Sequence, residues 1–163
     1  MKELSQPEQF VVAEKVDIEA PKGILNNVAV LGPCREHTQV EISLTDSKNI
    51  GVIGNIRQSG DIENTPGCIL IFKDKKIETN RGVIIAKRHI HMKPEEAQNH
   101  HLIDNEEVTV VVKDTDRTIA FSNVVVRVNK NYRLAMHLDT DEANACGCNE
   151  DSFGRFKALI LKK

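Results

Sequence analysis

Aromatic residues are scarce in this chain of 163 residues. There is no tryptophan, and aromatics make up 4% of the sequence, whereas 40% of the residues are hydrophobic. The core must therefore rest on valine, isoleucine and leucine. The length allows one sizeable domain or two small packed ones.

Long apolar runs and a strongly charged face are also absent. No segment reaches the roughly 18 consecutive apolar residues of a membrane span, and no charged-then-apolar signal stands at the N-terminus. The formal net charge is -2, with both signs scattered along the sequence, which argues against a nucleic-acid-binding surface. We therefore expect neither a membrane nor a nucleic acid as partner, although a few local cations could hold a small anion.

Cysteine occurs four times, at Cys34, Cys68, Cys146 and Cys148. Without a secretory signal, reduced thiols are expected rather than a disulfide framework. Cys146-Gly147-Cys148 has two interpretations. We favour small residues in a C-terminal turn over a metal or redox pair, because one C-x-C without a second cysteine pair is a weak zinc signal.

The chain is rich in short apolar runs that are separated by turn signals. Strands are predicted at residues 11–20, 24–31, 39–44, 52–57, 68–72, 82–91, 107–112, 118–121, 124–128, 132–138 and 154–161. Short helices are predicted at 45–51, with a Thr or Asp cap and a final glycine, at 94–100 and at 139–145. Because this plan recurs in both halves, the sequence predicts a mainly β fold of two small β-barrel domains, residues 1–80 and 81–163, with short capping helices.

Two histidines end the apolar run at residues 83–92. His89 and His91 are separated by one residue, so in a strand both side chains point to the same face and can share a metal ion. The alternative is that both are solvent-facing polar residues of a half-buried sheet. His137, in a second apolar run, is the third candidate ligand and favours the metal hypothesis.

Glu41 is the acid that we add to the histidines, because it shares a polar strand face with Gln39 and Ser43. Arg35 lies six residues earlier, and a guanidinium near a metal can bind phosphate through two parallel hydrogen bonds. For both residues, an ordinary exposed side chain is the alternative. Together these groups would suit a metal-assisted reaction on an anionic oxygen substrate.

Several separated motifs resemble the phosphate propanoyltransferase family (PduL-type phosphotransacylases). They occur in the family's order and cover most of the chain, from Leu4 to about Ala145. The motifs are Leu31-Gly32-Pro33-Cys34-Arg35 with Thr38-Gln39-Val40-Glu41-Ile42-Ser43-Leu44-Thr45-Asp46, Ser59-Gly60-Asp61, Arg88-His89-Ile90-His91-Met92, and Met136-His137-Leu138-Asp139-Thr140-Asp141-Glu142-Ala143-Asn144.

The resemblance implies an enzyme that moves an acyl group between coenzyme A and inorganic phosphate, with two zinc ions held between two small β-barrels. By similarity, His89, His91 and His137 would ligate one zinc. Glu41 would serve the other zinc, and Arg35 would bind phosphate. The coenzyme A contacts would map near Lys2, Leu31, Ser59, Ala86, His137 and Asn144. The expected location is the cytoplasm, with a bacterial microcompartment as the alternative.

One departure from the family concerns the N-terminal region. Family members carry an Asn-Arg-His-x-His segment upstream of the Leu4 region, which supplies two ligands to the zinc that Glu41 also holds. The sequence therefore predicts an incomplete first barrel and an isolated chain that is weakly active or inactive. A homo-oligomer or a second chain would complete the site; otherwise only one zinc binds. The competing functions are a non-catalytic metal-binding assembly module, an inactive truncated paralogue, or a small β-barrel hydrolase.

Overall fold

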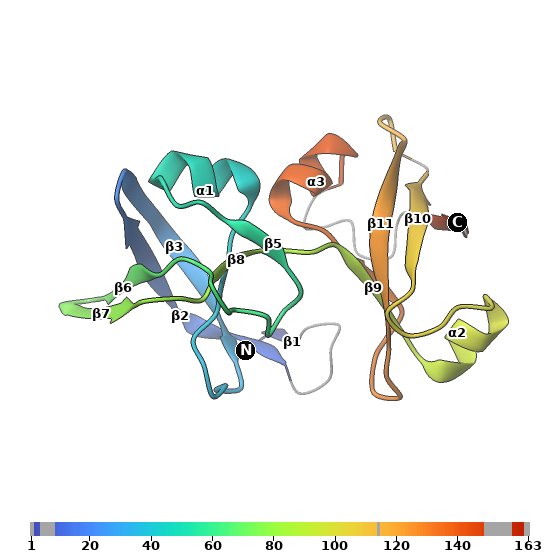
Figure 1. Cartoon of the computed structure of the whole chain (residues 1–163), viewed down its shortest axis with the longest axis horizontal. Coiled ribbons are helices and arrows are strands. Elements are labelled where there is room, and N and C mark those ends of the chain that lie inside the picture. Colours follow the sequence, from blue (N-terminus) through green and yellow to red (C-terminus); the bar gives the residue numbers. More distant parts are fainter. Residues whose placement is uncertain (1, 4–8, 114, 149–157, 162–163) are drawn as a thin grey trace. The chain divides into compact units, whose positions relative to one another are not determined.

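The computed structural model describes residues 2–3, 9–113, 115–148 and 158–161. Short strands dominate it, which confirms the mainly β prediction (Figure 1). The helices are α1 (Leu44–Ile50), α2 (Pro94–Asn99) and α3 (Thr140–Ala145). The strands are β1 (Lys2–Glu3), β2 (Phe10–Ala20), β3 (Gly23–Gly32), β4 (Val40–Glu41), β5 (Asn55–Arg57), β6 (Cys68–Phe72), β7 (Lys75–Thr79), β8 (Val83–Ala86), β9 (His89–Met92), β10 (Glu107–Val112), β11 (Ile119–Val128), β12 (Ala135–His137) and β13 (Ala158–Leu161).

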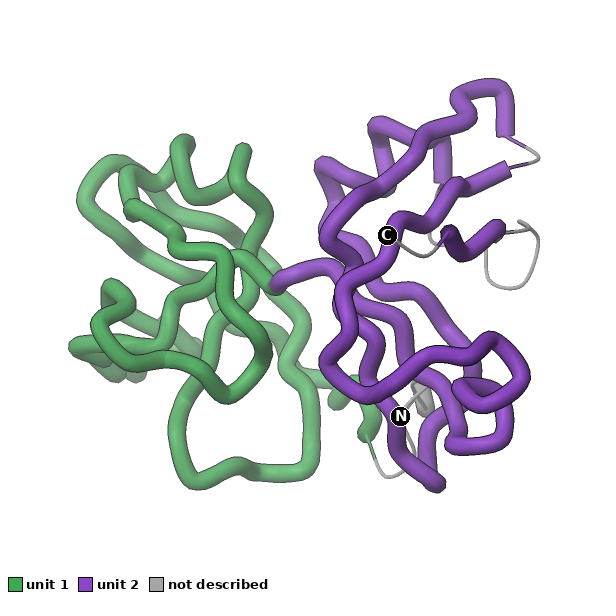
Figure 2. Tube along the Cα trace, turned by 45° about the vertical axis from the view of Figure 1, so that its right-hand side comes forward, with its two compact units in different colours: residues 1–86 green, residues 87–163 purple. Residues whose placement is uncertain are grey.

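The chain divides into two compact units, residues 1–86 and 87–163 (Figure 2). Strand β8 belongs to the first unit, whereas the sequence-based division at residues 80 and 81 placed it in the second. The exact domain limits stay a prediction. Each unit has its own core of mainly branched aliphatic side chains, as the scarcity of aromatics requires.

The first unit is built on the hairpin of β2 and β3. Strand β2 also pairs with β1 and β6, and β7 follows β6. A parallel sheet of β4, β8 and β5 completes the unit. Gly67, just before β6, allows the end of β7 to lie close, because an added Cβ would lie 1.8 Å from the carbonyl oxygen of Thr79.

The second unit is one sheet with the strand order β12-β9-β11-β10-β13. Strands β9 and β11 run parallel, and the other pairs are antiparallel. Among the described strands neither unit shows a closed strand order, so the barrel form stays a prediction. The helices have seven, six and six residues, far from the ~20 that a membrane span requires.

Two of the predicted elements are corrected by the structure. The strand expected at 39–44 covers Val40–Glu41 alone, since Ser43 leaves the sheet to cap α1 and accepts a hydrogen bond from the Asp46 amide. The cap is therefore this serine rather than Thr45 or Asp46, while Gly51 ends the helix with φ 76°, as expected.

The single strand expected at residues 82–91 is in fact two. Strand β8 pairs with β4 and β5 in the first unit, and β9 pairs with β11 and β12 in the second. The chain passes from one sheet to another at residues 87–88. Val83–Ala86 is continuously apolar and His89–Met92 alternates, but both patterns are typical of strands, so the sequence did not reveal the break.

Candidate metal centre

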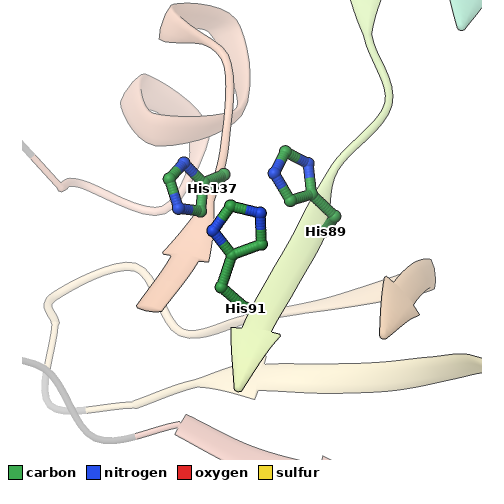
Figure 3. A group of neighbouring side chains, drawn as sticks. All are labelled: His89, His91 and His137. Carbon is green, nitrogen blue, oxygen red and sulfur yellow. The ribbon is translucent and has the colours of Figure 1, made fainter. Parts of the chain in front are cut away.

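Three histidines of the second unit gather at one place (Figure 3). His89 and His91 lie on β9, and the antiparallel register of β12 sets His137 opposite His89. One ring nitrogen from each histidine can be chosen so that all three lie within 4.8 Å of one another. The ring centroids are 4.5–4.7 Å apart. Convergence of these side chains, as predicted from the two separate apolar runs, is confirmed.

His91 is the residue that argues most strongly for a ligand. Its side chain is 1% exposed, which rules out the solvent-facing alternative for this histidine. Neither Nδ1 nor Nε2 has a hydrogen-bond partner among the described residues. Its ring stacks on Tyr132, with centroids 4.0 Å apart. A buried polar atom without a partner costs free energy, so a bound cation would satisfy an otherwise unfavourable group.

The protonation states of His91 and His137 at neutral pH also favour metal binding. Burial, and then the nearby His137 and His89, lowers the pKa of His91 to about 3. Burial, followed by His89 and Arg127, lowers the pKa of His137 to about 4. Both imidazoles are therefore neutral at pH 7, and a neutral imidazole has the free lone pair that a metal ion needs.

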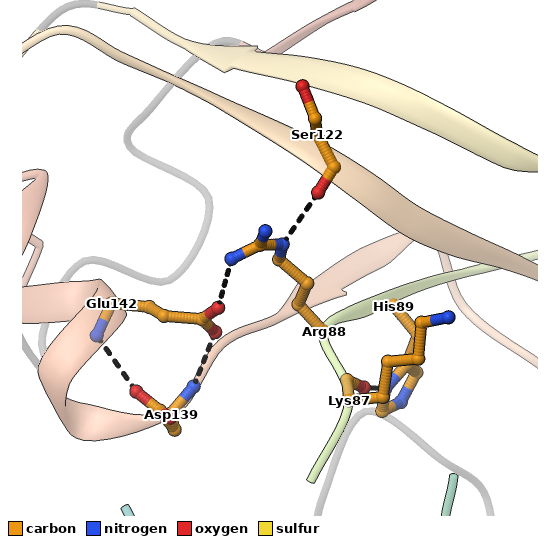
Figure 4. A network of polar contacts seen from close by, with 6 residues as sticks. All are labelled: Lys87, Arg88, His89, Ser122, Asp139 and Glu142. Atoms are coloured by element: carbon orange, nitrogen blue, oxygen red, sulfur yellow. Dashed lines mark hydrogen bonds and ion pairs between the residues drawn. The ribbon is translucent and has the colours of Figure 1, made fainter. Parts of the chain in front are cut away.

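His89 is oriented by the backbone. Its Nδ1 lies 2.9 Å from the carbonyl oxygen of Lys87 (Figure 4). When Nδ1 donates this bond, Nε2 is left to coordinate a metal, and such a carbonyl contact fixes the ring's tautomer and direction. Three converging imidazoles, one of them held in place by a backbone contact, are a donor set that fits a divalent transition metal such as zinc.

An ion pair links the strand that carries His89 to the helix that follows His137. Arg88 Nη1 donates to Glu142 Oε1 at 2.6 Å, and Arg88 Nε donates to the Ser122 carbonyl at 2.8 Å (Figure 4). Glu142 also belongs to the capping box of α3: the Asp139 side chain accepts from its amide at 2.8 Å, and the Asp139 amide donates to Oε2 at 3.2 Å. We call this set the Arg88–Glu142 clamp.

A second polar cluster lies in the first unit. Arg35 Nη1 donates to Ser59 Oγ at 3.0 Å, and Gln39 Nε2 contacts both Ser59 Oγ at 2.9 Å and Glu41 Oε1 at 2.6 Å. The structure thus brings together three residues that the sequence singled out, and Gln39 is the connecting side chain. Its amide oxygen also accepts from the Gly60 amide at 2.7 Å.

This cluster borders a cavity of about 420 Å³ in the first unit. Apolar residues such as Val16, Val28 and Leu70 form much of its lining. The cavity is also lined by Arg35, by Glu41 and by Leu31, which the sequence analysis expects near coenzyme A. His37 is another of the lining residues. The cavity therefore combines an apolar wall with a cation and a carboxylate.

The other candidate positions are distributed over both units. Lys2 lies in β1, Ala86 ends β8, and Asn144 is exposed on α3. His100 caps the C-terminal end of α2. The two clusters belong to different units of the chain.

Fold and site together define a mainly β protein with a three-histidine centre suited to a transition metal and an arginine–carboxylate cluster. A family model described as phosphate propanoyltransferase matches residues 1–149. The chain is 52% identical to a phosphate propanoyltransferase of Leptotrichia buccalis over 146 residues, which cover 90% of this chain and 69% of that protein. The corresponding enzyme of Thermotoga maritima is 48% identical, with 91% and 71% covered.

A third relative aligns along the whole chain. The phosphate propanoyltransferase of Clostridioides difficile is 44% identical over 163 residues, which cover 100% of this chain and 76% of that protein. The chain belongs to the phosphate propanoyltransferase family, which is a family of acyltransferases. The resemblance seen in the separated sequence motifs is confirmed.

Proposed function

We propose that this protein transfers a short acyl group, propanoyl or acetyl, between coenzyme A and inorganic phosphate. The family membership and the names of the relatives support this reaction. In the direction of acyl phosphate formation, a phosphate oxygen attacks the thioester carbonyl. The new C–O bond replaces the C–S bond, and the electron pair of that bond leaves with the thiolate of coenzyme A. No covalent enzyme intermediate is required, because a thiolate is a good leaving group.

His89, His91 and His137 would hold one zinc ion. The observation that carries this assignment is the pair of partnerless ring nitrogens on buried His91. Glu41 would serve a second zinc. Bound zinc would supply a Lewis acid that polarises the thioester carbonyl or orients phosphate.

Arg35 would bind and orient the phosphate. The Arg35 guanidinium donates to Ser59, and Gln39 in turn donates to Ser59. This contact limits the directions in which the remaining N–H groups of Arg35 point. A guanidinium can bind two phosphate oxygens at once. The positions that we assign to coenzyme A contacts are Lys2, Leu31, Ser59, Ala86, His137 and Asn144.

The experiment follows thiol release from propanoyl-coenzyme A by zinc-loaded protein, with and without phosphate. Arg35→Lys is the critical variant, because lysine keeps the charge and loses the two-pronged geometry. Arg57→Lys is the matched control, since Arg57 pairs with Asp61 on the surface. We expect release that needs phosphate and falls at least about tenfold in Arg35→Lys alone, as expected for loss of a hydrogen bond to a charged group.

Two outcomes would contradict the proposal. Zinc binding without any thiol release would favour a metal-binding module. Thioester loss that proceeds equally without phosphate would favour a hydrolase. A slow rate still decides the question, because the assay scores dependence on phosphate and on Arg35 rather than speed.

A further inference from the structure

Two thiols meet at the end of α3, outside the clusters described above. Cys146 Sγ lies 3.3 Å from Cys148 Sγ, and both cysteines are reduced. Cys146 is fully buried in the core of the second unit, and Cys148 is partly buried against that core. This pair, Cys146 with Cys148, is called the dithiol below.

The local backbone explains why residues two apart in sequence bring their sulfurs together. Gly147 has φ +73°, in the left-handed region that favours glycine. The turn lets the Cys148 amide donate to the Ala143 carbonyl at 2.9 Å, which closes the helix end. Both side chains therefore stay on the side of the core. Little movement is needed to shorten the sulfur separation to the roughly 2.05 Å of a disulfide.

We propose that the dithiol is a modification site, at which a small organic disulfide oxidises Cys146 and Cys148 to an intramolecular disulfide. Cys148 reacts first, because Cys146 is closed off from solvent. After losing its proton, Cys148 attacks one sulfur of the small disulfide, whose S–S bond breaks and releases one thiol. Cys146, also deprotonated, then attacks Cys148 Sγ and displaces the second thiol. Two protein thiols are oxidised, and one small disulfide is reduced to two thiols.

The surroundings keep the pair reduced until such a reagent is in excess. Burial, and then the hydrogen bond with Cys146, raises the pKa of Cys148 to about 11. The thiolate fraction at neutral pH is therefore small, and exchange is slow. The dithiol shares no residue with the proposed metal ligands or coenzyme A contacts.

The test uses the 163-residue chain with Cys34→Ser, because Cys34 is exposed and would react as well. Native protein is incubated with excess hydroxyethyl disulfide, and its intact mass is measured without reductant. We expect the mass to fall by about 2 Da, the two hydrogens lost on disulfide formation, and to return with dithiothreitol. Peptide mapping should place the bond between Cys146 and Cys148.

Two further variants, each made in the Cys34→Ser protein, identify the roles of the two sulfurs. Cys146→Ser should retain a mixed disulfide on Cys148, with a gain of about 76 Da, because the second step is blocked. Cys148→Ser should stay unmodified and, since Cys146 is untouched, should keep the native circular dichroism spectrum. An unchanged mass of the Cys34→Ser protein, or a stable adduct on it without ring closure, would overturn the proposal.

Discussion

Replacement of His91 by phenylalanine separates a metal ligand from an ordinary core residue. The substitution keeps a planar ring of similar size, which can still stack on Tyr132 at the 4.0 Å centroid distance. It removes both ring nitrogens, which lack partners among the described residues. If His91 stabilises the fold, its replacement should lower the free energy of unfolding. If His91 is a metal ligand, its replacement should not destabilise the metal-free protein.

The magnitude follows from the burial of these two nitrogens. A buried polar group without a hydrogen bond costs about 1–3 kcal/mol. The larger phenyl ring costs some overpacking, for which about 1 kcal/mol is a typical lower value. We therefore expect the metal-free variant at pH 7 to be as stable as the parent or up to about 2 kcal/mol more stable.

Urea unfolding of chelator-treated protein measures this difference. The chain has one tyrosine and no tryptophan, so Tyr132 fluorescence reports on the second unit, and circular dichroism follows the whole chain. His100→Phe is the matched control, because His100 is exposed at the end of α2. Added zinc should raise the unfolding midpoint of the parent and of the control but not that of His91→Phe. A metal-free loss of about 2 kcal/mol or more in His91→Phe would refute the reasoning.

Three other predictions concern the histidine pKa values, the Arg88–Glu142 clamp and Gly67. Folding lowers the pKa values of His91 and His137 below the ordinary 6.5, so as the pH falls the unfolded chain binds protons first. Metal-free protein should lose about 1.4 kcal/mol per histidine per pH unit between pH 6.5 and the folded pKa, about 4 for His137 and about 3 for His91, measured by urea unfolding. A pH-independent difference between parent and His91→Phe would contradict this. Arg88→Lys keeps the positive charge but cannot donate to both the Ser122 carbonyl and Glu142. It should weaken zinc binding roughly 10- to 100-fold in chelator competition. Unchanged affinity would show that the Arg88–Glu142 clamp does not position the histidines. Gly67→Ala should destabilise the first unit by about 2 kcal/mol or more, because its Cβ would meet the Thr79 carbonyl; a stable variant would mean that the β6–β7 hairpin readily shifts.

The parts of the site that the sequence revealed are those with a local signature. His89 and His91 could be assigned to one strand because side chains in a strand repeat every two residues, and the apolar residues around His137 marked a second strand. The short helix predicted at 139–145 was recognisable in the same way, because the residues that cap it, Asp139 and Glu142, lie only three positions apart.

The parts that stayed hidden depend on partners far apart in the chain. Arg88 and Glu142 are 54 residues apart, and no local pattern reveals which carboxylate a given arginine meets. The break between β8 and β9 was invisible for a related reason, because the choice of neighbouring strand, and not the alternation within the strand, separates the two sheets. Gln39 was noticed only as part of a polar face, although it joins Glu41 to Ser59.

Counting zinc in the parent protein and in His91→Phe, by elemental analysis after loading and dialysis, tests the three-histidine centre most directly. The account predicts that the parent retains one more zinc ion per chain than the variant, since loss of one imidazole leaves an incomplete ligand set. Equal zinc content in the two proteins, with both folded, would contradict it.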